Sequence, residues 1–272
     1  MIYITKQNTK VLKSKDHKEC AMISGAYVIH ISQRNDRDEN IVQLRQVLTH
    51  SPLSLFCPAH LTVFEAKKQA DGRRGCYESH VAVMRLALEA NATLPALIFE
   101  DDAQIAWEAS GASQVQLRQC QEVQQFFNDA KKFDILYLGS FPNLFVSKSA
   151  IQVESYQHIY QSRPSMTHAY IASPRLMKLM TTVFATYEGV EIDNLYSKFN
   201  GFVNYAVYPS IFLQSLSASD ISPTLSLSTL PIKEFIWSAC EVYVKNVQCS
   251  VKEALLWIFF FCVLTKLCFT KL

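Results

Sequence analysis

Short apolar runs alternate with longer amphipathic segments over the first two hundred residues of the chain. The apolar runs are rich in β-branched and aromatic residues, which is typical of buried strands, whereas the longer segments repeat their apolar positions at helical spacing. The pattern predicts strands at 25–31, 61–64, 95–99, 133–138, 167–172 and 203–208, with helices at 38–48, 76–90 and 114–130 and a further helix that begins at Ser173-Pro174.

Strands that alternate with helices in this way favour an α/β fold built on one sheet. A chain of 272 residues is long enough to bury a substantial core in such a domain. We expect three parts: a lysine-rich arm at 1–24, an α/β domain at 25–222, and a Ser/Thr/Pro-rich linker followed by apolar helices at 223–272.

Composition excludes some classes of protein. Hydrophobic residues make up 49% of the chain and charged residues 18%, so general disorder is not expected. The net charge of +2 gives no electrostatic reason to expect a nucleic-acid partner. The lysines of the first twenty residues could contact anionic lipid or an acidic acceptor, or could belong to a solvated terminus.

The cysteines and the apolar terminal run bear on the compartment. Eight cysteines occur without a CxxC pair or a Cys/His spacing typical of zinc sites, and the first residues are polar, so we expect reduced thiols in a cytoplasmic protein. The run 254–264 is shorter than the roughly 20 residues that a spanning helix needs. It could pack on its own domain or lie at a membrane surface, which makes peripheral membrane contact an open alternative.

Three carboxylates, Glu100-Asp101-Asp102, directly follow the buried run 95–99. The run delivers them to the carboxyl edge of the sheet, where α/β folds bind ligands, and adjacent like charges need a partner. A Mg²⁺ or Mn²⁺ ion that bridges these oxygens and a diphosphate would satisfy this need. The alternative is an acidic turn that caps a following helix. Neither GxGxxG nor GxxxxGK[ST] occurs, which argues against dinucleotide enzymes and P-loop nucleotidases.

A series of short motifs occurs in order over roughly 25–222. They are YVIHI at 27–31 with Arg34 and Arg37, GCYESH at 75–80, LIFEDD at 97–102, DILYLG at 134–139, HAYIAS at 168–173, Ile192-Asp193, Tyr208-Pro209, Gln214 and Ser219-Asp220-Ile221. Their order resembles glycosyltransferase family 25, which includes bacterial lipooligosaccharide transferases and procollagen galactosyltransferases. Two departures from the family pattern are His30, where asparagine is usual, and Arg73-Arg74, which precede the glycine of the second motif in place of an acidic residue.

This resemblance implies a GT-A-like, Rossmann-like sheet that binds a nucleotide-sugar donor such as UDP-galactose. It also implies Mn²⁺ or Mg²⁺ as cofactor and inversion at the anomeric carbon. Asp102 is the expected metal ligand, and Asp101 and Glu100 would bind the metal through water or hold the ribose. Asp193, near a helix start, is the expected base for the acceptor hydroxyl, with helix capping as its alternative.

Five further residues are candidates for donor binding. Arg34 and Arg37 could pair with phosphate or lie in a solvated turn. His80 and His168 could contact the diphosphate or the metal, or be core histidines. Ser79 could hydrogen-bond the donor or stabilise a turn.

The resemblance implies an inverting hexosyltransferase that acts on a glycan or glycolipid acceptor, such as the core of lipopolysaccharide or lipooligosaccharide, at the cytoplasmic membrane face. A metal-dependent nucleotidyltransferase or nucleotide-sugar hydrolase could use the same carboxylates. A catalytically inactive, membrane-associated scaffold is the non-enzymatic alternative.

Overall fold

The computed structural model describes residues 22–50, 61–106, 114–129, 131–140, 150–164 and 166–215. The lysines of the N-terminal arm, the linker and the apolar C-terminal run therefore lie outside the described residues. Within the described part of the chain, no helix combines the length and the apolar character needed to cross a membrane.

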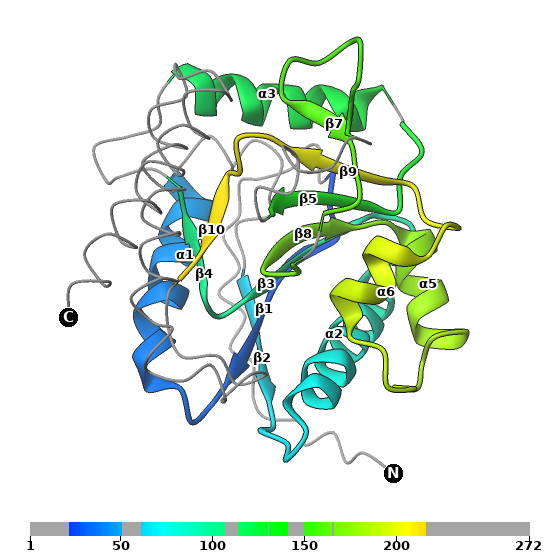
Figure 1. The fold of residues 1–272 in the computed structure, drawn as a ribbon. Coiled ribbons are helices and arrows are strands. Elements are labelled where there is room, and N and C mark those ends of the chain that lie inside the picture. The colour runs from blue at the N-terminus through cyan, green and yellow to red at the C-terminus, as the bar shows by residue number, and fades with distance from the viewer. Residues whose placement is uncertain are drawn as a thin grey trace, which may run out of the picture.

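An eight-stranded mixed sheet forms the centre of the domain (Figure 1). Its order is β2-β1-β3-β8-β5-β9-β7-β6, and a separate antiparallel pair joins β4 to β10. The strands are β1 (Gly25–Ile31), β2 (Leu61–Ala66), β3 (Ala96–Glu100), β4 (Ala103–Ile105), β5 (Ile135–Gly139), β6 (Ile151–Gln152), β7 (Ile159–Gln161), β8 (Ala169–Ala172), β9 (Asn204–Val207) and β10 (Phe212–Gln214).

Helices cover both faces of this sheet, so its central strands are buried on both sides. One core joins α1 and α3 to strand residues such as Val28, Leu97 and Phe99. The other joins α2, α5 and α6 to the alternate residues, among them Tyr27 and Ile98. The helices are the 3₁₀ turn η1 (Asn35–Arg37), α1 (Asp38–His50), α2 (Gly72–Ala90), α3 (Gln114–Asn128), α5 (Pro174–Thr182) and α6 (Ile192–Lys198).

The structure confirms the predicted GT-A-like α/β class, a sheet flanked by helices, and most of the predicted elements. Helix α5 begins as predicted, since Pro174 opens it and the Ser173 side chain accepts a hydrogen bond from the backbone of Leu176. Helix α2 begins earlier than the predicted residue 76. The Asp71 side chain accepts hydrogen bonds from two backbone amides of the first turn, which starts the helix at Gly72.

Strand β8 runs antiparallel to both of its neighbours, β3 and β5, which are parallel to each other across it. The first residues of β8 therefore lie at the edge where β3 and β5 end. The backbone amide of Glu100 donates to the carbonyl of His168 at 2.9 Å across this edge. The antiparallel insertion brings the 167–168 segment beside the carboxylate run.

Candidate active site

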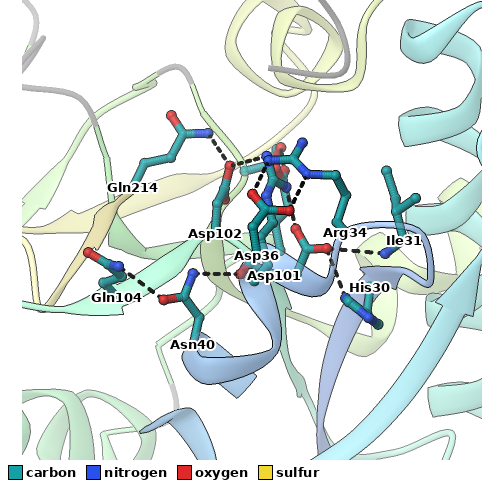
Figure 2. A network of polar contacts seen from close by, with 12 residues as sticks. His30, Ile31, Arg34, Asp36, Asn40, Asp101, Asp102, Gln104 and Gln214 are labelled. Carbon is teal, nitrogen blue, oxygen red and sulfur yellow. Dashed lines mark hydrogen bonds and ion pairs between the residues drawn. The ribbon is translucent and has the colours of Figure 1, made fainter. Parts of the chain in front are cut away.

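Asp101 is the structural centre of the carboxylate run (Figure 2). Its Oδ2 accepts from the backbone amide of Ile31 at 3.1 Å and lies 3.1 Å from Nδ1 of His30, while its Oδ1 accepts from Nη1 of Arg37. The residue is only 2% exposed. Both carboxylate oxygens are thus held by β1 and by η1, which fixes the turn that follows β3.

Amide side chains hold the same turn from two sides. Nδ2 of Asn40 donates to the backbone carbonyl of Asp101 at 3.0 Å, and Nε2 of Gln104 donates to Oδ1 of Asn40 at 3.0 Å. From β10, Nε2 of Gln214 donates to Oδ2 of Asp102 at 3.1 Å (Figure 2). Helix α1 and the β4–β10 pair therefore position consecutive residues of the carboxylate run.

Asp102 has one satisfied carboxylate oxygen and one unsatisfied oxygen. Its Oδ2 accepts a hydrogen bond from Nε2 of Gln214 and lies 3.8 Å from Nη2 of Arg37. Its Oδ1 is buried and has no hydrogen-bond partner among the described residues. Burial, and then the charge of Glu100, raise the pKa of Asp102 to about 7 despite Arg37. A buried carboxylate oxygen without a donor is suited to bind a cation.

The side chain of Glu100 contacts a different set of residues from those that contact Asp101 and Asp102. Its Oε1 accepts from Oγ1 of Thr167 at 2.5 Å and lies 3.3 Å from Nε2 of His80. Burial raises the pKa of Glu100, but the hydrogen bond and charge of His80, together with Thr167, outweigh it and bring the pKa to about 2. Glu100 is therefore an ionised carboxylate at neutral pH, whereas Asp102, with a pKa of about 7, is only partly ionised there.

His80 and Ser79 are adjacent on α2 but have different contacts. His80 is completely buried, with Nδ1 lying 2.8 Å from the hydroxyl of Tyr170 and Nε2 facing Glu100. The Ser79 hydroxyl donates to the carbonyl of Gly75 at 2.7 Å, one turn earlier in the same helix. The structure thus brings His80 to the carboxylates and engages Ser79 within its own helix.

His168 carries an unsatisfied nitrogen at the same edge. Its Nε2 lies 3.2 Å from the carbonyl oxygen of Phe212, which can only accept, so Nε2 carries the proton and Nδ1 is an acceptor. That Nδ1 is buried and has no partner among the described residues. Burial lowers the pKa of His168. The imidazole occupies the space that a side chain at Gly139 would fill, because a Cβ there would lie 2.1 Å from Nε2.

The two arginines after β1 differ in their surroundings. Arg37 is 6% exposed and pairs with the carboxylates, so the expectation of a solvated turn is wrong for this residue. Its burial follows from the charge of Asp101, which it compensates. Arg34 donates from Nε and Nη2 to the two oxygens of the exposed Asp36, at 2.8 Å each.

Asp193 is the second residue of α6 and is partly buried. Glu191 occupies the N-cap position but makes no side-chain capping hydrogen bond, and Oδ1 of Asp193 accepts from the neighbouring first-turn amide of Asn194 at 2.7 Å. Burial, followed by the charges of Glu191 and Glu100, raises the pKa of Asp193. A raised pKa makes this carboxylate a stronger base than an exposed aspartate.

Three contributors to the site were not expected from the sequence, namely Asn40, Thr167 and the amide of Gln214 that meets Asp102. The sequence marked His30 only as a departure from the family pattern. In the structure, Ile29 of β1 is opposite Glu100 of β3, and Nδ1 of the next residue, His30, lies 3.1 Å from Oδ2 of Asp101. Thr167 lies just before β8, and Gln214 is the last residue of β10. No local sequence pattern indicates how these two strands pair.

Comparison with known protein families shows that the chain matches one family model. The model of glycosyltransferase family 25 (LPS biosynthesis protein) matches residues 25–196, more than half of the chain, and the matched part includes the carboxylate run and Asp193. No curated protein matches the chain.

Two solved structures have low similarity to the chain. The crystal structure of A197 from STIV has 8% identity and a TM-score of 0.40, and the match covers 69% of this chain and 82% of that one. UDP-glucose pyrophosphorylase from Acinetobacter baumanii has 13% identity and a TM-score of 0.34, with 67% and 69% covered.

Proposed function

This chain belongs to glycosyltransferase family 25, and we propose that it transfers a hexose from a nucleotide-diphosphate sugar to a glycan hydroxyl with inversion at the anomeric carbon. UDP-galactose is the first candidate donor. The core of lipopolysaccharide or lipooligosaccharide is the first candidate acceptor, in agreement with the description of the family as an LPS biosynthesis protein.

The observation that carries this proposal is the buried Oδ1 of Asp102, which has no hydrogen-bond partner in the part of the chain that the structure describes. The residues fit a Mn²⁺ or Mg²⁺ ion, because carboxylate oxygens are the ligands that these cations prefer. Asp102 would be the direct ligand, and Glu100 would contribute through water. Asp101 could do the same, or hold the ribose, only by giving up contacts to His30 or Arg37, so we assign it mainly to positioning.

The bound cation would neutralise charge on the diphosphate and make it a better leaving group. Arg37 already offsets the charge of Asp101 and Asp102, and with Arg34 it lies on the segment that follows β1. Nδ1 of His168, which no described residue contacts with a hydrogen bond, would accept a hydrogen bond from the nucleotide sugar or serve as a further ligand of the cation. His80 would act through Glu100, whose orientation it holds.

Transfer also needs a base that removes the proton of the acceptor hydroxyl. We assign this role to Asp193, because its carboxylate is partly buried and its pKa is raised. A base is most effective when its pKa lies near the working pH. Glu100 is a poorer candidate, since its pKa of about 2 makes it a weak base.

A glycolipid acceptor would place the enzyme at the cytoplasmic membrane face. The lysines among the first twenty residues support this location, because a basic segment is attracted to anionic lipid.

Calorimetric titration of UDP and UDP-galactose, with and without Mn²⁺, tests the proposal on wild-type protein and on Asp102→Asn. We expect Mn²⁺-dependent binding by the wild type and its loss in the variant. Binding that is indifferent to Mn²⁺, or equal in both proteins, would overturn the assignment of Asp102. Incubation with acceptor glycans then separates transfer from the alternative, because a hydrolase releases free sugar without any acceptor.

A further inference from the structure

A thiol, an imidazole and a carboxylate meet between α2 and β3. Cys76 and His80 are four residues apart on α2 and so share one side of the helix, and Glu100 ends the neighbouring strand β3. One ligand atom from each of the three residues lies within 4.8 Å of the other two. Sequence spacing alone did not indicate this group, because its third member lies on a different element.

The donor set of this group is typical of zinc. Zn²⁺ is bound by cysteine sulfur, histidine nitrogen and carboxylate oxygen, whereas Mg²⁺ and Mn²⁺ favour oxygen ligands. Zinc–ligand bonds of about 2.0–2.3 Å place tetrahedral ligand atoms roughly 3.3–3.8 Å apart. Nε2 of His80 and Oε1 of Glu100 are already 3.3 Å apart, and the ligand atoms of all three residues lie within 4.8 Å of one another, so an approach of the thiol by roughly 1 Å would complete the geometry.

The surrounding hydrogen bonds orient two of the three ligands. The hydroxyl of Tyr170 lies 2.8 Å from Nδ1 of His80, which leaves Nε2 directed at Glu100, and Oγ1 of Thr167 donates to the Glu100 carboxylate. Partners of this kind on the far side of a ligand fix its orientation and raise metal affinity. His80 is completely buried, so its ring cannot turn freely away from the site.

The electrostatic surroundings also favour a cation. Burial raises the pKa of the Cys76 thiol, and the charges of Glu100, Asp193, Asp102 and Glu191 raise it further. The same negative field that disfavours a bare thiolate attracts a divalent cation. On binding, the thiol proton would pass to solvent and the sulfur would bind as thiolate.

We propose that Cys76, His80 and Glu100 bind one Zn²⁺ ion directly, at a second cation site next to the oxygen site at Asp102, to which Glu100 would contribute only through water. Three protein ligands leave the fourth tetrahedral position for water. The site does not depend on the transferase reaction, because it is defined by metal binding alone. Thiol ligation distinguishes it from the Asp102 site, for which we propose oxygen ligands.

Cobalt titration of the full-length, reduced, metal-free protein tests the proposal, since Co²⁺ reports thiolate ligation by a charge-transfer band and tetrahedral geometry by its visible bands. We expect both signals at one equivalent in the wild type, and their loss when Zn²⁺ is added. Cys76→Ser and Cys76→Ala should lose the band. Cys120→Ser is the matched control, because Cys120 is a buried free cysteine on α3 and should keep the signal.

Asp102→Asn separates the two cation sites and should retain the cobalt band even where Mn²⁺-dependent nucleotide binding is lost. A folded wild type without the band overturns the zinc site, whatever the variants do. A band of equal strength in the Cys76 variants also overturns it, because other thiols would then be the ligands. Loss of nucleotide binding alone would affect only the transferase proposal.

Discussion

Arg37 donates a hydrogen bond from Nη1 to Oδ1 of Asp101, and both side chains are at most 7% exposed. The pair joins the turn after β1 to the turn after β3, so that two segments 64 residues apart share one buried charge pair. A buried charge is stable only with such a partner. Both ends of the candidate site are therefore fixed before any ligand binds.

Asp101→Ala should destabilise the protein by about 3–5 kcal/mol, because removal of one partner leaves the charge of Arg37 buried and uncompensated. Urea unfolding measures the change. Asp36→Ala is the control, since Asp36 is exposed and pairs with Arg34 at the surface, where loss of a pair costs less than about 1 kcal/mol. Equal losses in the two variants would show that the Arg37–Asp101 pair does not hold the fold.

Gly139→Ala should destabilise the protein by about 1–3 kcal/mol and weaken nucleotide binding. The added Cβ would lie 2.1 Å from Nε2 of His168 and 2.8 Å from the carbonyl oxygen of Phe212, so the imidazole and β10 must move. Thermal unfolding and calorimetry measure the two effects. Gly75→Ala is the control, because its Cβ would meet only Gln69 at 3.4 Å and helical alanine is favoured over glycine. Neutral behaviour of Gly139→Ala would contradict the close packing of His168.

The pKa of Asp102, raised from 3.8 to about 7, predicts how stability changes with pH. Well below pH 4, Asp102 is protonated in both the folded and the unfolded protein, so its ionisation does not change the free energy of unfolding. As pH rises from about 4 to 7, only the unfolded state has lost this proton, so ionisation of Asp102 lowers stability.

Asp102→Asn should therefore be more stable than the wild type at pH 8, by about 2–4 kcal/mol, and the difference should vanish near pH 4. Urea unfolding across this range tests the sign. Mn²⁺ at pH 8 should stabilise the wild type and leave the variant unchanged, because a bound cation replaces the missing partner. A difference that is constant with pH would show that the pKa of Asp102 is the same in the folded and unfolded protein.

The elements that the sequence predicted are those with a strong local signal. Strand β3 is a continuous apolar run, and its carboxylates follow directly, so both the strand and the edge position of Asp102 could be predicted. Helix α5 has a serine cap and a proline at its start. Helix α2 was placed too late because its capping residue, Asp71, lies in a polar stretch without apolar periodicity.

The contacts that complete the site depend on tertiary pairing. Gln214 meets Asp102 because β4 and β10, each three residues long, pair across more than a hundred residues. Thr167 meets Glu100 because β8 runs antiparallel between parallel neighbours. Strand direction and such short pairings are set by the whole sheet, so the local apolar pattern cannot indicate them.

Asp193→Asn should lower kcat for transfer at least about 100-fold while leaving the Kd for the nucleotide sugar within about twofold, because a general base acts on the acceptor and not on the donor. Steady-state transfer to the acceptor found in the glycan screen, with donor calorimetry alongside, measures both quantities. Glu191→Gln is the matched control, since Glu191 occupies the N-cap position of the same helix and raises the pKa of Asp193 without being assigned to the reaction. It should retain most of kcat. Full activity of Asp193→Asn would remove this residue from catalysis, and a parallel loss of donor binding would show instead that Asp193 organises the donor site.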